Sequence, residues 1–348
     1  MDLRYIKQFQ EQLLGWYDAH ARILPWRDQP APYRVWISEI MLQQTRVDTV
    51  KPYFERFMEV LPSIQALAEV SDDQLMKLWE GLGYYSRARN LKKAAQQVME
   101  DFGGQLPAQP EELQKLPGIG PYSSGAISSI AFGVKAPAID GNVLRVIARI
   151  TANTGDITNN GVKKEIEKQV LDLLPDARIG DFNQALMELG ATVCVPNGLP
   201  KCEQCPVHSL CKGSQQGIAA DLPVKQKKKK RKLEDKTIFV IEYRGKIAVR
   251  KRPEEGLLAG LWEFPNTEGH LFYEEAGGKL AEWGISLGGI LPLQNSKHIF
   301  THLEWHMIGY FVEAVHVEDK GLFTWVTREE LAEQYSIPTA YKAYTDAL

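Results

Sequence analysis

Apolar residues recur every three or four positions over most of the first half of the chain. This is the period of an amphipathic α-helix, and six segments show it: residues 6–17, 48–61, 72–83, 89–102, 163–174 and 181–190. Glycine, proline and Asp/Ser pairs separate the segments, as is typical of helix boundaries. The pattern predicts an all-helical domain in this part of the chain.

The period changes in the last third of the chain. Strand-like alternation occurs in three segments and helical spacing in two: residues 236–243, 246–252 and 306–317 for strands, and 274–284 and 328–335 for helices. Arg244-Gly245, between the first two strands, suits a tight turn. We therefore expect a second domain of mixed α and β structure.

A strongly basic stretch separates the two patterns. Lys225–Asp235 carries seven basic residues in its first eight positions. Such a run cannot bury apolar surface, so we expect a solvated flexible linker at residues 223–235. The same residues can bind phosphate by releasing counterions from DNA, and the two roles are compatible. The domain boundaries that follow are 1–222 and 236–348.

Composition and charge limit the possible classes of protein. The chain has 348 residues, enough for two domains, and its 44% hydrophobic and 24% charged residues are typical of globular proteins. No apolar run approaches the roughly 20 residues that span a bilayer, and the amphipathic start is not a secretory signal. We therefore expect a cytoplasmic protein, with a monomer as the default. The net charge of −3 argues against a uniformly basic surface but permits a local patch for nucleic acid.

A glycine-rich turn lies between two helical segments at LPGIGPYSSGAI, residues 116–127. Gly118 and Gly120 permit a tight turn, and the unpaired N–H groups of the following helix favour an anion such as a phosphate. An ordinary helix–helix turn would explain the same residues. Asp140 follows twenty residues after Gly120 and precedes another helical run, where capping is the commonest role of an aspartate.

Five segments together resemble the helix-hairpin-helix DNA glycosylase superfamily and, within it, the adenine glycosylase (MutY) family: WISEIMLQQTRV (36–47), GLGYYSRARNL (81–91), LPGIGPYSSGAI (116–127), IDGNVLRV (139–146) and FNQALMELGATVC (182–194). The resemblance covers nearly the whole chain. It implies a multidomain protein with an N-terminal all-α glycosylase domain, a helix-hairpin-helix at about residues 111–133, and a C-terminal α+β Nudix-like domain.

The resemblance assigns the catalytic groups. Glu39 falls on the family's general acid, and apolar neighbours on its helical face should raise its pKa; taken alone, it would be an ordinary half-exposed glutamate. Asp140 falls on the carboxylate that stabilises the oxocarbenium-like sugar, with Asn142 as a partner. Tyr122 stands where a bifunctional relative has the lysine that forms a Schiff base with the sugar. A monofunctional enzyme is implied.

Other matching positions belong to the flipped base and the duplex. The resemblance assigns the adenine pocket to Arg22, Trp26, Arg27 and Gln184. It assigns DNA contacts to Gln44, Thr45, Leu82, Tyr84, Gly118, Gly120 and Gly260. A polar side chain and a flat aromatic ring can fill the gap left by a flipped base and stack on its neighbours, although helix packing would also explain the tyrosine.

All four cysteines lie within residues 194–211, as Cys194, Cys202, Cys205 and Cys211. Their spacing, C-x7-C-x2-C-x5-C, suits one metal cluster held by four thiolates, whereas structural zinc sites usually show two short C-x2–4-C pairs. The resemblance implies a [4Fe–4S] cluster in this loop. The family's first gap is one residue shorter, so the shape of the loop around Pro196–Pro200 should differ.

The C-terminal domain resembles a Nudix domain at LLAGLWEFPNTE, residues 257–268, but the paired glutamates of the catalytic Nudix box are missing. Without them little would hold Mg²⁺, so we expect binding without hydrolysis. The family's Phe-Ser-His sensing loop corresponds to Phe300, Thr301 and His302, which would sense 8-oxoguanine. A strand-edge loop with a packed phenylalanine is the structural alternative. A metal site at His298, His302 and His306 is disfavoured by the strand context.

The function implied is the hydrolytic removal of adenine mispaired with 8-oxoguanine or guanine in double-stranded DNA, in base excision repair. The protein would associate with the nucleoid when on DNA. Three alternatives remain: a bifunctional glycosylase/lyase for damaged pyrimidines, a non-catalytic DNA-binding module, and a Nudix hydrolase with a DNA-binding tail. The second hairpin helix has no lysine, which argues against the lyase. The pair Glu39 and Asp140 argues against a non-catalytic module, and the degenerate Nudix box argues against a Nudix hydrolase.

Overall fold

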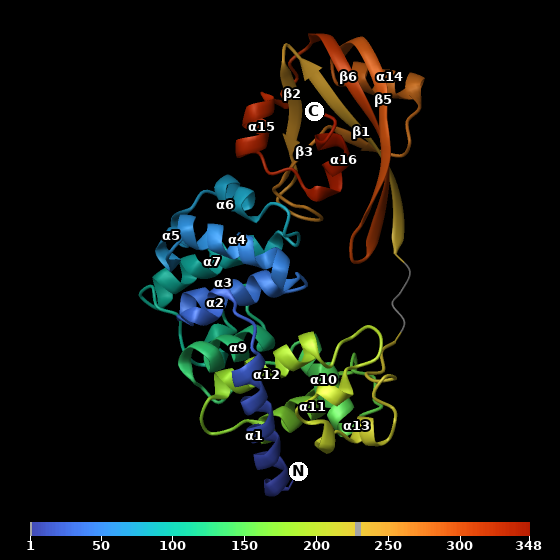
Figure 1. The fold of residues 1–348 in the computed structure, drawn as a ribbon. Coiled ribbons are helices and arrows are strands. Elements are labelled where there is room, and N and C mark those ends of the chain that lie inside the picture. The colour runs from blue at the N-terminus through green and yellow to red at the C-terminus, as the bar shows by residue number, and fades with distance from the viewer. Residues whose placement is uncertain (1, 227–230) are drawn as a thin grey trace. The chain divides into compact units, whose positions relative to one another are not determined.

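The computed structural model describes residues 2–226 and 231–348 (Figure 1). The chain divides into two units: Met1–Glu69 with Asn90–Lys227, and Val70–Arg89 with Lys228–Leu348. The centre of the predicted linker, residues 227–230, lies outside the described residues. No helix in the described part of the chain is long and apolar enough to cross a membrane.

The first unit is built almost entirely of helices. It contains α1 (Leu3–His20), α2 (Pro25–Asp28), α3 (Pro32–Leu42), α4 (Val47–Val60), α5 (Ile64–Glu69), most of α7 (Ser86–Asp101), α8 (Pro110–Leu113), α9 (Pro121–Phe132), α10 (Gly141–Thr151), α11 (Asn160–Leu173), α12 (Ile179–Thr192), α13 (Lys212–Gln215), and 3₁₀ turns at Cys202–Gln204 and His208–Leu210. The helical period of the sequence is thereby confirmed. Of the predicted helices in this unit, each is found within a few residues of its expected bounds.

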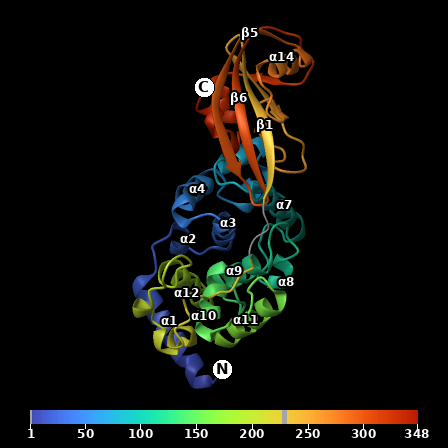
Figure 2. The same ribbon diagram turned by 90° about the vertical axis from the view of Figure 1, so that its right-hand side faces the viewer.

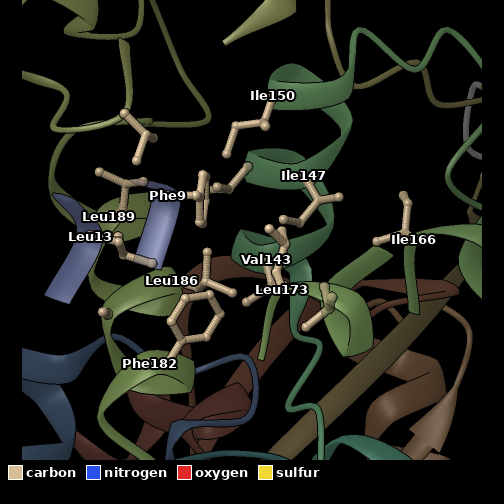
Figure 3. Close-up of a cluster of buried hydrophobic side chains, with 14 of the residues drawn as sticks. Phe9, Leu13, Val143, Ile147, Ile150, Ile166, Leu173, Phe182, Leu186 and Leu189 are labelled. Atoms are coloured by element: carbon tan, nitrogen blue, oxygen red, sulfur yellow. The ribbon is translucent and has the colours of Figure 1, made fainter. Parts of the chain in front are cut away.

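One hydrophobic core joins four of these helices. Side chains of α1, α10, α11 and α12 meet in it, as Figure 3 shows for Phe9, Leu13, Val143, Ile147, Ile166, Phe182 and Leu186. All seven are fully buried. Burial of such side chains contributes about 1.5–3 kcal/mol each. The core therefore fixes α10 and α12, the two helices that carry Asp140 at one end and Gln184 along one face.

The second unit contains a mixed sheet with helices on both faces (Figures 1 and 2). Its strands are β1 (Lys232–Tyr243), β2 (Lys246–Lys251), β3 (Trp262–Glu263), β4 (Asn266–Glu268), β5 (Ile285–Ile299), β6 (Leu303–Val317) and β7 (Thr324–Val326), in the order β3-β2-β1-β6-β5, with β4 on β1 and β7 on β2. The pair β1–β6 is parallel and the other pairs are antiparallel. One hydrophobic cluster includes residues of α14 (Tyr273–Glu282), and another includes residues of α15 (Arg328–Gln334) and α16 (Lys342–Thr345).

Three features differ from the sequence prediction. Helix α6 (Asp72–Trp79) ends before Gly81 and Gly83, whose φ angles are +96° and +70°, so the predicted helix 72–83 is too long. Strand β5 was not predicted, because its glycines and Pro292 interrupt the alternation and its pairing with β6 is irregular. Strand β1 begins at Lys232, inside the predicted linker 223–235, since its edge pairs with β6.

Residues 70–89 join the second unit, which periodicity alone did not indicate. Ser336 donates a hydrogen bond to the Met76 carbonyl (3.2 Å), and the Ile337 N–H donates to the Glu80 carboxylate (2.9 Å). Because these bonds lie between a helical segment and a distant part of the chain, only the tertiary fold could show them.

Candidate active site

Helix α3 carries Glu39 on its buried side. Pro32 starts the helix at the position where a missing N–H costs nothing, and Val35 and Trp36 pack inside with the glutamate, which is 6% exposed. Burial raises the pKa of Glu39 to about 7, while the hydrogen bond from Tyr122 lowers it and the nearby Asp140 raises it. The rise in pKa expected from the sequence is confirmed. At neutral pH this carboxyl group is therefore protonated in a substantial fraction of molecules.

Tyr122 lies in the first turn of α9 and donates its hydroxyl hydrogen to Glu39 Oε2. Gly120 is the N-cap of this helix and Pro121 its first residue. Gly118 has φ +80°, and a Cβ there would lie 2.8 Å from Asn90 Cβ, so the turn requires glycine. Burial and the carboxyl groups nearby raise the pKa of Tyr122 well above its ordinary value, so it stays a hydrogen-bond donor. The hairpin thus delivers a donor to one oxygen of Glu39. No described residue bonds the other oxygen, which can carry the proton.

Asp140 is the N-cap of α10, and it also faces the same cavity as Glu39. Its Oδ1 accepts from the Val143 N–H (2.7 Å) and its Oδ2 from Asn142 Nδ2 (2.7 Å). Burial raises the pKa of Asp140, whereas these hydrogen bonds and Arg145 act in the opposite direction. The sequence left two alternatives for Asp140, a helix cap or a site residue. In the structure it caps α10 and also lines the cavity.

Asn183 fixes the segment that leads to Asp140, and sequence reasoning missed it. Its side-chain nitrogen donates to Ser129 Oγ and the Ala136 carbonyl, both at 2.8 Å, and its oxygen accepts from the Ala138 N–H (3.2 Å). The residue is fully buried. An amide on the apolar face of a predicted helix was the one signal available, because a buried polar group needs partners.

Helices α12 and α10 approach closely at Gly190. A Cβ at this position would lie 2.6 Å from Asn142 Cβ, so any other residue would force the helices apart. Arg145 strengthens the junction by donating to the Gly190 carbonyl and to Asn142 Oδ1, both at 2.8 Å. The spacing between α12 and the aspartate end of α10 is therefore tightly set.

Two arginines and a buried glutamate form one wall of the cavity. Arg22 Nε and Arg27 Nη2 contact Glu188 at 2.5 and 2.9 Å, and Arg27 Nε donates to Gln184 Oε1 at 3.1 Å. Burial would raise the pKa of Glu188, but hydrogen bonds and charge from the arginines lower it overall. The predicted pocket residues Arg22, Arg27 and Gln184 are thus brought together. Glu188 was not predicted, although it lies one turn after Gln184 on the same face.

These groups surround a cavity of about 730 Å³. Its lining includes the predicted residues Arg22, Trp26, Arg27, Glu39, Gln44, Thr45, Tyr122, Asp140, Asn142 and Gln184. Gln44 is exposed and has φ +58°, a conformation that non-glycine residues rarely adopt. Lys225, from the start of the basic run, also lines the cavity. The volume lies in the range of pockets that hold small molecules.

The four cysteines line a separate small cavity with the side chains of α10 and α12. Arg149 Nη1 donates to Cys194 Sγ (3.3 Å), and Arg145 Nε donates to the Cys194 carbonyl (2.8 Å). Within the described residues, no three His, Cys, Asp or Glu side chains converge as ligands of a single metal ion. Four thiols that line one cavity have the chemistry of a group held by sulfur ligands.

The remaining predicted residues lie in the second unit. Tyr84 is exposed and has φ +48°, whereas Leu82 is 5% exposed, so the structure does not present the Leu82 side chain for contact with DNA. Gly260, with φ +66°, donates its N–H to the Pro253 carbonyl (2.9 Å).

Residues 300–302 form the turn between β5 and β6. Thr301 and His302 are exposed, while Phe300 packs its ring on Trp305, with centroids 4.9 Å apart. Tyr84 and Thr301 share a hydrogen bond between their hydroxyl groups (3.2 Å). The turn therefore has an anchored phenylalanine and two presented polar side chains. His298 and His306 lie on the two strands, as their sequence context suggested.

Two family models and two solved structures define the class. Residues 37–171 match the HhH-GPD superfamily of base excision DNA repair proteins, and residues 237–347 match the NUDIX domain. A thermostable thymine-DNA glycosylase is 29% identical with a TM-score of 0.55, and an endonuclease III–DNA complex is 23% identical with a TM-score of 0.52; each match covers 61% of this chain and 98% of that chain. The chain is thus a helix-hairpin-helix DNA glycosylase with a Nudix-like C-terminal domain, and the predicted fold class is confirmed.

Curated relatives narrow this class. The adenine DNA glycosylase of Mus musculus is 36% identical over 98% of this chain and 78% of that protein. Those of Homo sapiens (35%, over 98% and 74%) and of Buchnera aphidicola subsp. Schizaphis graminum (35%, over 87% of each) are similar along most of their length. The chain belongs to the adenine DNA glycosylase family.

Proposed function

We propose that the protein removes adenine from duplex DNA where adenine lies opposite 8-oxoguanine or guanine. The observation that carries this proposal is the pair of buried carboxyl groups in one cavity, Glu39 with its pKa raised to about 7 and Asp140 at the start of α10. The names of the curated relatives support adenine as the base. The Nudix-like domain, matched without a complete Nudix box, supports a binding role.

The chemistry assigned to the cavity is hydrolysis of the bond between the base and the sugar. Glu39 donates its proton to a ring nitrogen of adenine while the C1′–N9 bond breaks and its electron pair leaves with the purine. The positive charge that develops on the sugar is stabilised by the Asp140 carboxylate. Water then adds to C1′, and the proton that it loses restores Glu39. Tyr122 holds Glu39 by one oxygen throughout, and Asn142 holds Asp140.

Extraction of the base requires the duplex to be opened, at a cost of a few kcal/mol. Gln44 and Tyr84 are exposed and suited to fill the gap or stack beside it. We assign recognition of 8-oxoguanine to Phe300, Thr301 and His302, with the Thr301 hydroxyl supplying the hydrogen-bonding group that serine supplies in the family. Gly118 and Gly120 are assigned to the DNA backbone.

The cysteine cavity is assigned a [4Fe–4S] cluster held by Cys194, Cys202, Cys205 and Cys211. Burial raises the pKa of Cys205 to about 12 and also raises the pKa of Cys211, so these two thiols would keep their protons without a metal. When bound, the cluster supplies a structural cross-link of residues 194–211 and no bond-breaking chemistry. Iron at about four atoms per chain and visible absorbance would support this, and stoichiometric zinc without iron would refute it.

Excision assays on defined duplexes test the function. A duplex with adenine opposite 8-oxoguanine is incubated with the protein, and the sample is divided with and without alkali. We expect strand breaks at the adenine mainly after alkali, and Asp140→Asn should bind the duplex without excision. Absence of breaks in both samples would favour a binding module, and normal turnover by Asp140→Asn would refute its role.

Equal strand breaks without alkali would instead indicate a lyase. Lys225 is the residue to examine in that case, because it lines the cavity although α9 has no lysine. Its amine could form a Schiff base with the opened sugar. Reduction with borohydride would then trap a covalent protein–DNA adduct that Lys225→Gln does not form.

A further inference from the structure

The cavity wall formed by α2 and α12 contains a chain of three side chains that ends in an amide. Glu188 accepts from Arg27 Nη2 (2.9 Å), Arg27 Nη1 donates to the Arg22 carbonyl (3.1 Å), and Arg27 Nε donates to Gln184 Oε1 (3.1 Å). The guanidinium is thus bonded on three sides. Glu188 is 1% exposed, whereas Gln184 is half-buried and lines the cavity.

The Arg27 guanidinium carries donors alone, so the group that faces it must be an acceptor. Gln184 therefore turns its oxygen toward Arg27, which uses one of the two lone pairs of that oxygen. No other described residue bonds this amide, so its nitrogen and the second lone pair of its oxygen remain for a base. Turning the amide over would place an NH₂ group against the Arg27 N–H and lose the bond. A free glutamine has no such preference, because its oxygen and nitrogen occupy nearly the same space.

The orientation of the amide matters because purines carry either a hydrogen-bond donor or an acceptor at C6. Adenine carries an amino donor at C6 beside ring-nitrogen acceptors, and a glutamine amide reads this pair with its oxygen and nitrogen together. Hypoxanthine and guanine carry a carbonyl acceptor at C6, so the amide must turn over to bond them. An amide held in one orientation reads one of these patterns, and an amide that turns freely reads both.

We propose that Glu188, by holding Arg27, keeps the Gln184 amide in a single orientation and thereby makes the pocket select adenine over purines with a carbonyl at C6. This rests on the proposed function, since it concerns the base excised. Glu188 and Arg27 are positioning residues, and Gln184 is the group that touches the base. Glu188 lies four residues after Gln184 on α12, one turn along the same face. The helix therefore presents the anchor and the reading group together.

The test compares two substrates in the same variants. Single-turnover excision is measured on duplexes with adenine or hypoxanthine opposite 8-oxoguanine, and the ratio of the two rates is the readout. Glu188→Gln keeps the shape of the side chain and removes its charge, and we expect the ratio to fall about tenfold, equivalent to about 1.4 kcal/mol. Arg27→Lys keeps a charge but lacks the planar fork, so it should lower the ratio similarly. A variant with general loss of structure would slow both substrates and leave the ratio unchanged.

Glu263→Gln is the matched control, because Glu263 is also buried between two arginines but lies in the second unit. It should leave the ratio within about twofold of the original. Gln184→Met should lower the ratio by itself, and Glu188→Gln should add nothing in that background, since its effect passes through the amide. An unchanged ratio in both Glu188→Gln and Arg27→Lys overturns the proposal. Failure of the unmodified protein to excise adenine would instead refute the proposed function.

Discussion

Glu188 in the first unit and Glu263 in the second occupy almost the same electrostatic surroundings. Each is nearly fully buried between two arginines, and the arginine side chains are 37% and 16% exposed around Glu188 and 35% and 17% around Glu263. The two networks end differently. Tyr341, fully buried, donates to Glu263 (2.7 Å) and closes that network inside the core, whereas the network of Glu188 ends at an amide beside a cavity.

The comparison shows that a buried ion pair does not by itself mark a functional site. Glu263 connects β2, β3 and the 3₁₀ turn at Thr339–Tyr341 through bonds from Arg250, Arg252 and Tyr341. Glu39 adds a third case. It is buried, no arginine of the described residues forms an ion pair with it, and its pKa rises, whereas the pKa of both paired glutamates falls. Glu39 and the network of Glu188 differ from Glu263 because they present hydrogen-bonding groups, not used by other described residues, to a cavity.

The largest expected effect separates Glu39 from both paired glutamates. Glu39→Gln removes the proton donor but keeps the shape, so single-turnover excision of adenine should fall by about 10²–10⁴-fold. Binding of the mispaired duplex, measured by gel shift or anisotropy, should persist. Glu263→Gln in the same assay should change the excision rate by no more than about twofold. An equal loss of excision rate in Glu39→Gln and Glu263→Gln would mean that Glu39 affects the rate by stabilising the fold and not as the proton donor.

Truncation of either buried glutamate to alanine should lower the stability of the unit that contains it. Glu188→Ala and Glu263→Ala each leave two arginines without their anion, which costs about 3–5 kcal/mol for a buried pair and less here because one arginine of each is over a third exposed. Hydrogen exchange of peptides from each unit measures the loss. Protection should fall in the first unit for Glu188→Ala and in the second for Glu263→Ala. Loss confined to the same unit in both variants would contradict the division.

The pH dependence of excision should distinguish Glu39, whose pKa is raised, from Glu188 and Glu263, whose pKa values are lowered. The acid acts in its protonated form and its pKa is raised to about 7, so the rate should be nearly constant below that pH and fall tenfold per unit above it. Glu188 and Glu263 stay ionised over that range because their pKa values are lowered. Single-turnover excision rates, measured from about pH 6 to 9 on a duplex with adenine opposite 8-oxoguanine, give the pH profile. A rate that rises with pH would exclude Glu39 as the acid.

The smallest expected effect concerns the turn of the second unit. Thr301→Ser keeps the hydroxyl that bonds Tyr84 and removes one methyl from an exposed position, so the preference for 8-oxoguanine over guanine opposite adenine should change less than about twofold. Thr301→Val keeps the shape and removes the hydroxyl, and should lower that preference. The ratio of excision rates on the two duplexes checks both. A fall with serine as large as with valine would make the methyl the important group.

The sequence predicted the elements that follow a regular period, and the structure confirms them as α1, α4, α7, α11 and α12 and the first hairpin of the sheet. It did not predict β5, because glycine and proline hide its alternation, nor the membership of residues 70–89 in the second unit, because that depends on bonds between distant segments.

The candidate site was predictable where residues lie in family-like motifs. Glu39, Tyr122 and Asp140 were expected, and the structure brings them to one cavity. Glu188 and Asn183 were missed, since a glutamate and an asparagine on a helix become notable only when burial and partners are known. Leu82 was expected at the DNA and is buried, because the loop of positive-φ residues around it turns its apolar side chain inward and Tyr84 outward.

The contact of Gly190 with Asn142 has a consequence for the ways in which this enzyme could acquire a new substrate. Helix α12 cannot move closer to α10, because Gly190 rests directly on Asn142, the hydrogen-bond partner of Asp140. Arg145 bonds both Gly190 and Asn142, and this opposes separation of the two helices. A larger or differently shaped base could not be accommodated by widening the pocket along this direction. New specificity would have to come from exchanging side chains on a fixed frame, which makes the face of α12 the natural place for laboratory selection.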